Sequence, residues 1–132
     1  MRFVTDYGKG ILGKPDSKEV WKQIISNIPD EVFLKKDVKI LNVACGHCTE
    51  ADIIVKRMLA LGCTTSKIKD SIYLIDKYSV FTKDAKRKGY INVIKADFLN
   101  WETDMKFDVV VGNPPFKDPR GKNAIYQHFY NK

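Results

Sequence analysis

The stretch Asp108-Val109-Val110-Val111-Gly112-Asn113-Pro114-Pro115-Phe116 constrains the fold more than any other part of the chain. Its three valines are β-branched and apolar, which predicts a strand that is buried on both faces. Gly112 allows a sharp turn or a close approach to a ligand, and the two prolines make the following segment stiff and extended. An amide, free carbonyls and an aromatic ring are thereby held at the carboxyl end of a strand, which is where ligands bind in open α/β sheets.

Four apolar strands that alternate with helical patterns predict an α/β fold with a parallel sheet and right-handed crossovers. The spacing of Asp16 with Glu19 and of Thr49 with Asp52 is that of capping boxes, and Gly62 and Gly89 suit helix C-termini. The glycine-rich segment from Tyr7 to Pro15 is expected to be a loop. We expect strands over Val38–Val43, Ser71–Asp76, Ile91–Lys95 and Phe107–Val111, and helices between Asp16 and Pro29, from Thr49 to Leu59, from Ser79 to Lys88 and from Ala124 to Tyr130.

Composition limits the class of protein. The 132 residues, 44% hydrophobic and 30% charged, are enough for one globular domain. No apolar run approaches the ~20 residues of a membrane span, and the first residues lack the apolar core of a secretory signal. Three cysteines are an odd number, which favours a reducing compartment and a cytoplasmic location.

The chain is basic, with a net charge of +7, which suits a polyanion such as nucleic acid. One basic cluster runs from Lys83 to Lys88 and has the pattern of a solvated helix face. A second follows Phe116 directly, at Lys117, Arg120 and Lys122, where a phosphate contact is more plausible.

Polar residues also stand at the carboxyl ends of the other predicted strands. The segment from Asn42 to Cys48 is a tight loop of small residues before a helix, which presents backbone N–H groups to a ligand. Asp76 can accept hydrogen bonds from two ribose hydroxyls, and Lys77 and Tyr78 beside it can pack on a nucleoside. Asp97 follows the third strand. Each feature also has an interpretation without a ligand, as a tight turn, a capping Asp or a turn Asp.

The cysteines and histidines do not form a recognisable metal or nucleophile site. Cys45-x-x-Cys48 with His47 between them invites a zinc interpretation, but zinc normally has four ligands in two spaced pairs, and only Cys63 remains. A thioredoxin-like redox motif needs another strand order and is also disfavoured. Neither His47 nor His128 has an obvious nucleophile partner.

Asn113-Pro114-Pro115-Phe116 resembles the NPPF/NPPY motif of S-adenosylmethionine-dependent methyltransferases that act on exocyclic or amide nitrogens. Among them, the N6-adenine DNA methyltransferases of phages and restriction-modification systems are similar over Ile72–Tyr78, Tyr90–Phe98 and Phe107–Phe116. The loop after the first strand resembles their Asp-Pro-Ala-Cys-Gly-Thr-Gly. In it Ala44, Cys45 and Gly46 match, whereas Asn42, Val43, His47 and Cys48 replace the acid, the proline, the threonine and the second glycine.

This resemblance implies a Rossmann-like class I methyltransferase fold, S-adenosyl-L-methionine as cofactor and DNA as partner. Asp97 would accept a hydrogen bond from the cofactor's adenine amino group, and Phe98 would stack on its ring. The cofactor-binding residues that it implies are Asn42, Ala44, Cys45, Gly46, Glu50, Asp76, Lys77, Asp97, Phe98 and Asn113.

The resemblance also implies catalytic roles for Asn113, Pro114, Pro115 and Phe116. The lone pair of the adenine amino group is delocalised into the ring, which makes that nitrogen a poor nucleophile. Hydrogen bonds accepted by Asn113 Oδ1 and the Pro114 carbonyl would draw its N–H groups out of conjugation, so positioning and electrostatics would carry the step. Phe116 would stack on a base flipped out of the duplex.

The resemblance covers residues 9 to 130 and corresponds to the N-terminal half of a class I enzyme, which has seven strands. We therefore expect a single, incomplete methyltransferase domain over residues 1–132, with about four parallel strands and flanking helices. We expect this domain to be truncated after the NPPF motif and to lack a target-recognition domain. Because a sheet that ends at its fourth strand leaves an open edge, we expect either a fragment or short relative of such enzymes, or a second chain or copy that completes the sheet. Two alternatives stay open: a methyltransferase that acts on RNA or protein glutamine, and a non-catalytic S-adenosylmethionine-binding module.

Overall fold

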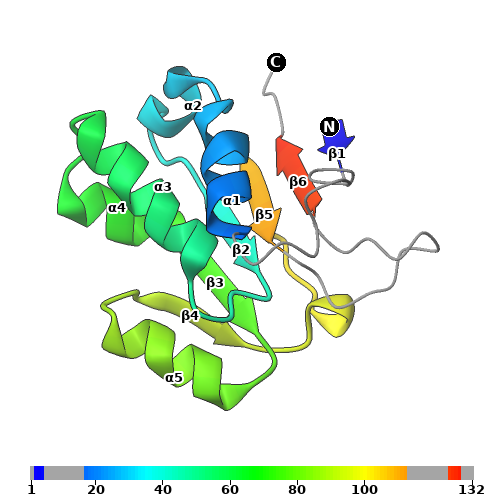
Figure 1. Ribbon diagram of the computed structural model, residues 1–132. Coiled ribbons are helices and arrows are strands. Elements are labelled where there is room, and N and C mark those ends of the chain that lie inside the picture. Colours follow the sequence, from blue (N-terminus) through cyan, green and yellow to red (C-terminus); the bar gives the residue numbers. More distant parts are fainter. Residues whose placement is uncertain (1, 5–16, 113–124, 129–132) are drawn as a thin grey trace.

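The computed structural model describes residues 2–4, 17–112 and 125–128 (Figure 1). Within these ranges the helices are α1 Ser17–Ser26, α2 Asp30–Leu34, α3 Thr49–Ala60, α4 Thr65–Ser71, α5 Ser79–Arg87 and the short 3-10 helix η1 Phe98–Asn100. The strands are β1 Arg2–Val4, β2 Ile40–Val43, β3 Ile72–Asp76, β4 Asn92–Lys95, β5 Val109–Gly112 and β6 Ile125–His128.

The described strands form one sheet in the order β1-β6-β5-β2-β3-β4. Strands β5, β2, β3 and β4 run parallel, whereas β6 and β1 are antiparallel to their neighbours. This confirms the predicted α/β fold with four parallel strands. Val43 lies opposite both Ile75 and Gly112, so three strands reach the same edge of the sheet. The order of strands reverses between β2 and β5, and such a switch point is a typical ligand site.

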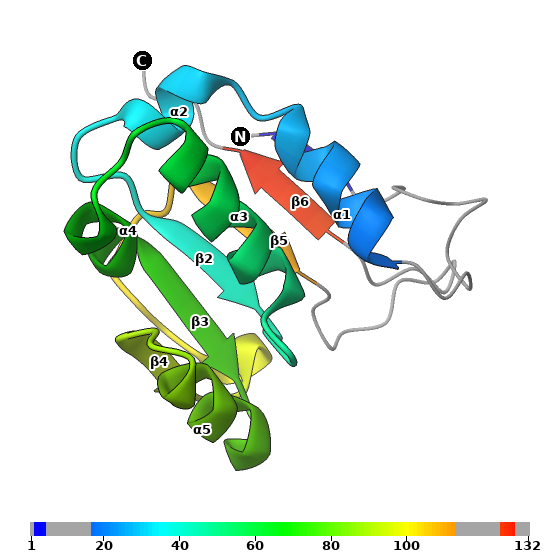
Figure 2. The same ribbon diagram turned by 60° about the vertical axis from the view of Figure 1, so that its left-hand side comes forward.

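Both faces of the sheet are covered by apolar side chains. Ile40, Val109 and Leu74 pack against the helices in the larger cluster, which includes Trp21, Ile54 and Phe33. Side chains that alternate with these along the strands point to the opposite face of the sheet. They pack against η1 and the segment that follows it. Figure 2 shows α1 and α3 side by side over the helix-covered face. The central strands are buried along their whole length, as the valine run predicts.

Several local predictions are wrong. The segment predicted as a helix from Ala124 to Tyr130 contains β6 instead, which pairs with β5 and is itself covered by β1. The edge of β5 is therefore occupied by this chain. Helix α4 was not predicted, and α1 ends at Ser26, three residues before Pro29, which precedes the separate α2. The predicted cap Asp16 and the loop over residues 7–15 lie outside the described residues.

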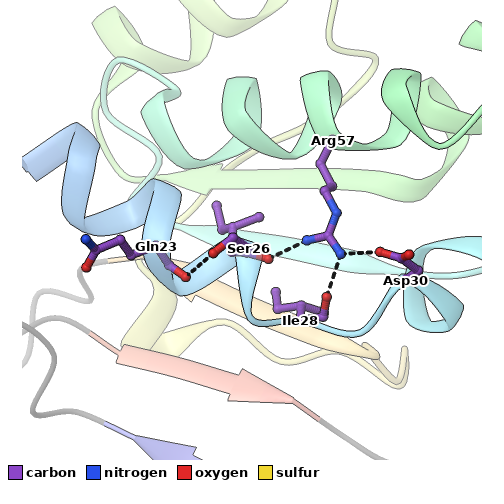
Figure 3. Close-up of polar contacts among 6 residues, drawn as sticks. Gln23, Ser26, Ile28, Asp30 and Arg57 are labelled. Carbon is purple, nitrogen blue, oxygen red and sulfur yellow. Dashed lines mark hydrogen bonds and ion pairs between the residues drawn. The ribbon is translucent and has the colours of Figure 1, made fainter.

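Arg57 connects α3 to the C-terminal end of α1. Its guanidinium donates to the carbonyl oxygens of Ile25 and Ile28, each at 2.7 Å, and to Asp30 Oδ1 at 2.6 Å (Figure 3). Carbonyls in the last turn of a helix have no partner within it, so a side chain that satisfies them fixes how the helix ends. The guanidinium also lies over the ring of Phe33, at 4.9 Å from its centroid.

A buried amide and carboxyl pair ties β2 to α3. Asn42 is fully buried; its Oδ1 accepts from the backbone N–H of Ala51 at 3.1 Å and its Nδ2 donates to Glu50 Oε1 at 3.0 Å. The predicted Thr49 cap is wrong: the residue that precedes α3 is Cys48, and its side chain makes no capping bond. Asn42 thus satisfies, from the neighbouring strand, one N–H at the start of the helix. Burial raises the pKa of Glu50 to about 6, although the hydrogen bond from Asn42 lowers it.

Gly112 is required where β5 meets β2. Its φ is +137°, and a Cβ there would lie 2.0 Å from the backbone oxygen of Val43. We expect Gly112→Ala to lower the free energy of unfolding by about 3 kcal/mol or more, because backbone strain and overlap with a neighbouring strand add together. Gly62→Ala is the matched control, since Gly62 also has a positive φ but nothing lies within 4 Å of its Cβ. Urea unfolding that gives equal losses for both variants would contradict this role.

The raised pKa of Glu50 predicts a pH-dependent stability. A carboxyl whose pKa is about 6 in the folded chain and ordinarily 4.5 stabilises the fold below pH 4.5, and this contribution is lost as the pH rises through 6. Glu50→Gln keeps an oxygen that can accept from Asn42 but does not titrate. The unfolding free energy of the variant minus that of the native chain should therefore be about 2 kcal/mol larger at about pH 8 than at acid pH. Glu102→Gln, at an exposed carboxylate, controls for the loss of one charge. Native and Glu50→Gln stabilities that stay parallel over this range would exclude the mechanism.

Candidate functional site

A hollow of about 230 Å³ opens where β2, β3 and β4 end. It receives residues from the loops after all three strands, because parallel strands in register bring their carboxyl ends to one edge. Six of the residues that the sequence predicts for a cofactor line it together, namely Ala44, Gly46, Asp76, Lys77, Asp97 and Phe98.

The loop between β2 and α3 forms the floor of the hollow in a tightly wound conformation. Ala44, Gly46 and Cys48 have φ values of +52°, +49° and +67°, in the left-handed region that non-glycine residues rarely adopt. Hydrogen bonds hold this shape: the Cys45 N–H donates to the Ile75 carbonyl at 3.1 Å, and the Gly46 N–H donates to Asp76 Oδ2 at 3.1 Å. The backbone of this loop therefore lies against the end of β3.

Asp76 organises the end of β3. The residue is only 6% exposed; its Oδ2 accepts from the Gly46 N–H, and its Oδ1 accepts from the Tyr78 N–H at 2.9 Å. Each carboxylate oxygen has a second lone pair, so the group can still accept hydroxyl donors from a ligand in the hollow. Asp76 thus combines the two interpretations of the sequence, since it structures the turn and lines the site.

Asp97 and Phe98 form another wall, after β4. Asp97 caps η1, because its Oδ1 accepts from the Leu99 N–H at 3.1 Å, and its Oδ2 accepts from Asn100 Nδ2 at 3.3 Å. Phe98 lines the hollow and also packs with the apolar cluster on the face of the sheet away from α1 and α3. Asp97 is therefore a turn residue that also lines the hollow.

An aromatic group borders the hollow on the α5 side, and the sequence pattern only partly indicated it. Tyr78 is 55% exposed, and its ring lies edge-on to Phe81 at 6.3 Å. Phe81 also meets the His47 ring at 5.3 Å, and Lys77 Nζ lies 5.2 Å from the Tyr78 ring centroid. Phe81 was missed because a Phe in an amphipathic helix resembles an ordinary core residue; its position five residues after Asp76 was the available signal.

The other predicted site residues do not line this hollow. Asn42 and Glu50 are buried against each other below the loop, and Cys45 is buried in the helix-side core at 2% exposure. They support the loop that does line it. Asn113, Pro114, Pro115 and Phe116 lie outside the described residues, although β5, which leads to them, ends at the same edge of the sheet.

The described residues contain no group of three or more His, Cys, Asp and Glu side chains that could hold a metal ion. Among the same residues, no helix has both the length and the apolar character needed to cross a bilayer.

Solved structures share this fold. The chain matches the plantazolicin methyltransferase BpumL in complex with SAH at 21% identity and a TM-score of 0.53, over 81% of this chain and 38% of that one. It matches DesVI of Streptomyces venezuelae at 15% identity and a TM-score of 0.51, over 83% of this chain and 55% of that one. The chain therefore has a Rossmann-like methyltransferase fold and spans less than two thirds of these proteins.

A search of curated proteins finds no match to the chain. The model of the Eco57I restriction-modification methylases matches residues 33–132, which include the strands that build the hollow. The chain belongs to the Eco57I restriction-modification methylase family.

Proposed function

We propose that this chain supplies the S-adenosylmethionine-binding part of an enzyme that methylates the N6 amino group of adenine in DNA. The observation that carries the proposal is the hollow itself, in which Asp76, Asp97 and Phe98 come together from the ends of adjacent parallel strands. Membership of a restriction-modification methylase family supports DNA as the acceptor, and a net charge of +7 favours a polyanionic partner.

The residues present fit the nucleoside part of the cofactor. The hollow, of about 230 Å³, is smaller than the ~300–1,000 Å³ of sites that enclose a whole drug-sized ligand, so it takes part of such a molecule. Two carboxylates suit the hydroxyl and amino donors of adenosine, and Phe98 offers an aromatic surface for its base. When bound, S-adenosylmethionine supplies a methyl group on a positively charged sulfur, which a nitrogen lone pair can attack.

The chain's own residues divide the work. Asp76 would accept hydrogen bonds from the ribose hydroxyls while it keeps the Gly46 N–H in place. Asp97 would accept a hydrogen bond from the adenine amino group, whereas Asn42 and Glu50 would act indirectly, because they fix the start of α3 and with it the loop. Asn113 and the Pro114 carbonyl orient the acceptor nitrogen, and Phe116 stacks on its base.

Asp76→Ala should weaken S-adenosylmethionine binding by about 1–3 kcal/mol, because a charged acceptor and the anchor of the loop are both lost. Isothermal titration calorimetry measures the change directly. Asp70→Ala, at an exposed carboxylate on α4, is the matched control and should leave the affinity unaltered. If Asp76→Ala binds as tightly as the native chain, Asp76 does not contact the cofactor.

Asn113→Ala should abolish methyl transfer while lowering cofactor affinity less than Asp76→Ala does, since its amide would act mainly on the acceptor. The measurement is transfer of a labelled methyl group from S-adenosylmethionine to adenine-containing duplex DNA, with RNA and protein as parallel acceptors. Normal turnover in this variant would refute the assigned role.

The same assay separates the remaining candidates. Label in DNA adenine supports the proposal, whereas label only in RNA or protein glutamine identifies another acceptor. Cofactor binding without transfer to any acceptor identifies a non-catalytic binding module.

A further inference from the structure

The two cysteines of the loop between β2 and α3 are neighbours. The Cys48 N–H donates to the Cys45 carbonyl at 2.7 Å, a turn that brings the two Cα atoms within about 7 Å. Disulfides join Cα atoms about 4.4–6.8 Å apart, so this turn has the span of one. Both cysteines are free thiols in the same buried cluster, at 2% and 0% exposure.

The surroundings distinguish the two sulfurs chemically. Cys48 directly precedes α3, a helix of twelve residues, and a helix N-terminus favours a thiolate. Lys88, at the end of α5, contacts both the loop and α3. Its Nζ donates to the His47 carbonyl at 2.8 Å and to Asp52 Oδ2 at 3.1 Å.

The pKa values of the two thiols shift in opposite directions. A hydrogen bond from the Cys45 thiol, aided by the Lys88 charge, lowers the pKa of Cys48 against the opposing effect of burial. The same hydrogen bond, together with burial, raises the pKa of Cys45. The position before α3 and these pKa directions both favour Cys48 over Cys45 as the attacking thiolate.

This pair is connected directly to the hollow. Ala44 and Gly46, on either side of Cys45, line the hollow, and the Gly46 N–H holds Asp76. The two sulfurs must approach to about 2.05 Å to form a disulfide. Bringing the sulfurs together therefore shifts the backbone between Cys45 and Cys48, which includes Gly46.

We propose that Cys45 and Cys48 form a redox-active dithiol that small disulfides such as glutathione disulfide oxidise, and that the resulting bond weakens ligand binding in the hollow. The effect on binding rests on the proposed function, because S-adenosylmethionine is the ligand concerned. The sulfurs are buried, so the first step requires the loop to open locally; His47 between them is exposed.

The reaction balances as a two-electron exchange. The Cys48 thiolate attacks one sulfur of glutathione disulfide, whose S–S bond breaks and releases one glutathione thiolate. Cys45, deprotonated as it reacts, then attacks the Cys48 sulfur and displaces the second glutathione. The protein dithiol is oxidised, the glutathione disulfide is reduced to two thiols, and the two protein protons end on these thiols.

The test uses the Cys63→Ser variant, which removes the third thiol, beside the native chain. Each is equilibrated in glutathione buffers, quenched with acid, alkylated and weighed by mass spectrometry. We expect Cys45 and Cys48 to lose their thiols together, without a retained glutathione, in both proteins. Two free thiols, or a stable glutathione adduct at one cysteine, would overturn the dithiol.

The effect on the hollow is measured on the same samples, so no substitution within the loop is needed. Calorimetry with S-adenosylmethionine should give about tenfold weaker binding to the oxidised chain, equivalent to the loss of one hydrogen bond, and dithiothreitol should restore it. Equal affinities in the two redox states would overturn the link to the hollow. If neither redox state binds S-adenosylmethionine, the proposed function fails. The mass measurement by itself still decides whether Cys45 and Cys48 form a disulfide.

Discussion

The arrangement of the site depends on the double-sided pairing of β2. This strand is buried on both faces and hydrogen-bonded in parallel to β3 and β5, with Val43 opposite Ile75 on one side and Gly112 on the other. Because the pairing is in register, the loops that follow these strands open at one edge. The polar groups of the hollow are adjacent for this reason, although Gly46, Asp76 and Asp97 are far apart in the sequence.

Much of the fold could be predicted because the four parallel strands are short apolar runs ended by turn residues, a strong local signal. The error over residues 124–130 has a physical cause. Ile125, Tyr126 and Phe129 favour strands as much as helices, and the decisive factor is the free edge of β5, which lies outside the segment itself. The tertiary partner of β6 was therefore invisible in its own sequence.

The candidate site was predictable where a residue stands at a strand end, as Asp76, Asp97 and Phe98 do, because topology alone carries such residues to the ligand edge. It was less predictable around α3. The sequence pointed to Thr49 as the cap, whereas the helix start is satisfied by Asn42, nine residues before Ala51. Such a bond follows from the packing of a strand against a helix, and local spacing contains no sign of it.

The pairing of β1 with β6 bears on how the chain acquires its structure during synthesis. Arg2 lies opposite His128, so β1 is made long before the strand with which it pairs. Contacts with this sequence separation are slow to form. During translation β5 therefore has an unpaired edge until residues 125–128 emerge, and unpaired edges attract other chains. In that interval the nascent chain therefore presents the backbone N–H and C=O groups of the β5 edge to any other strand that can pair with them.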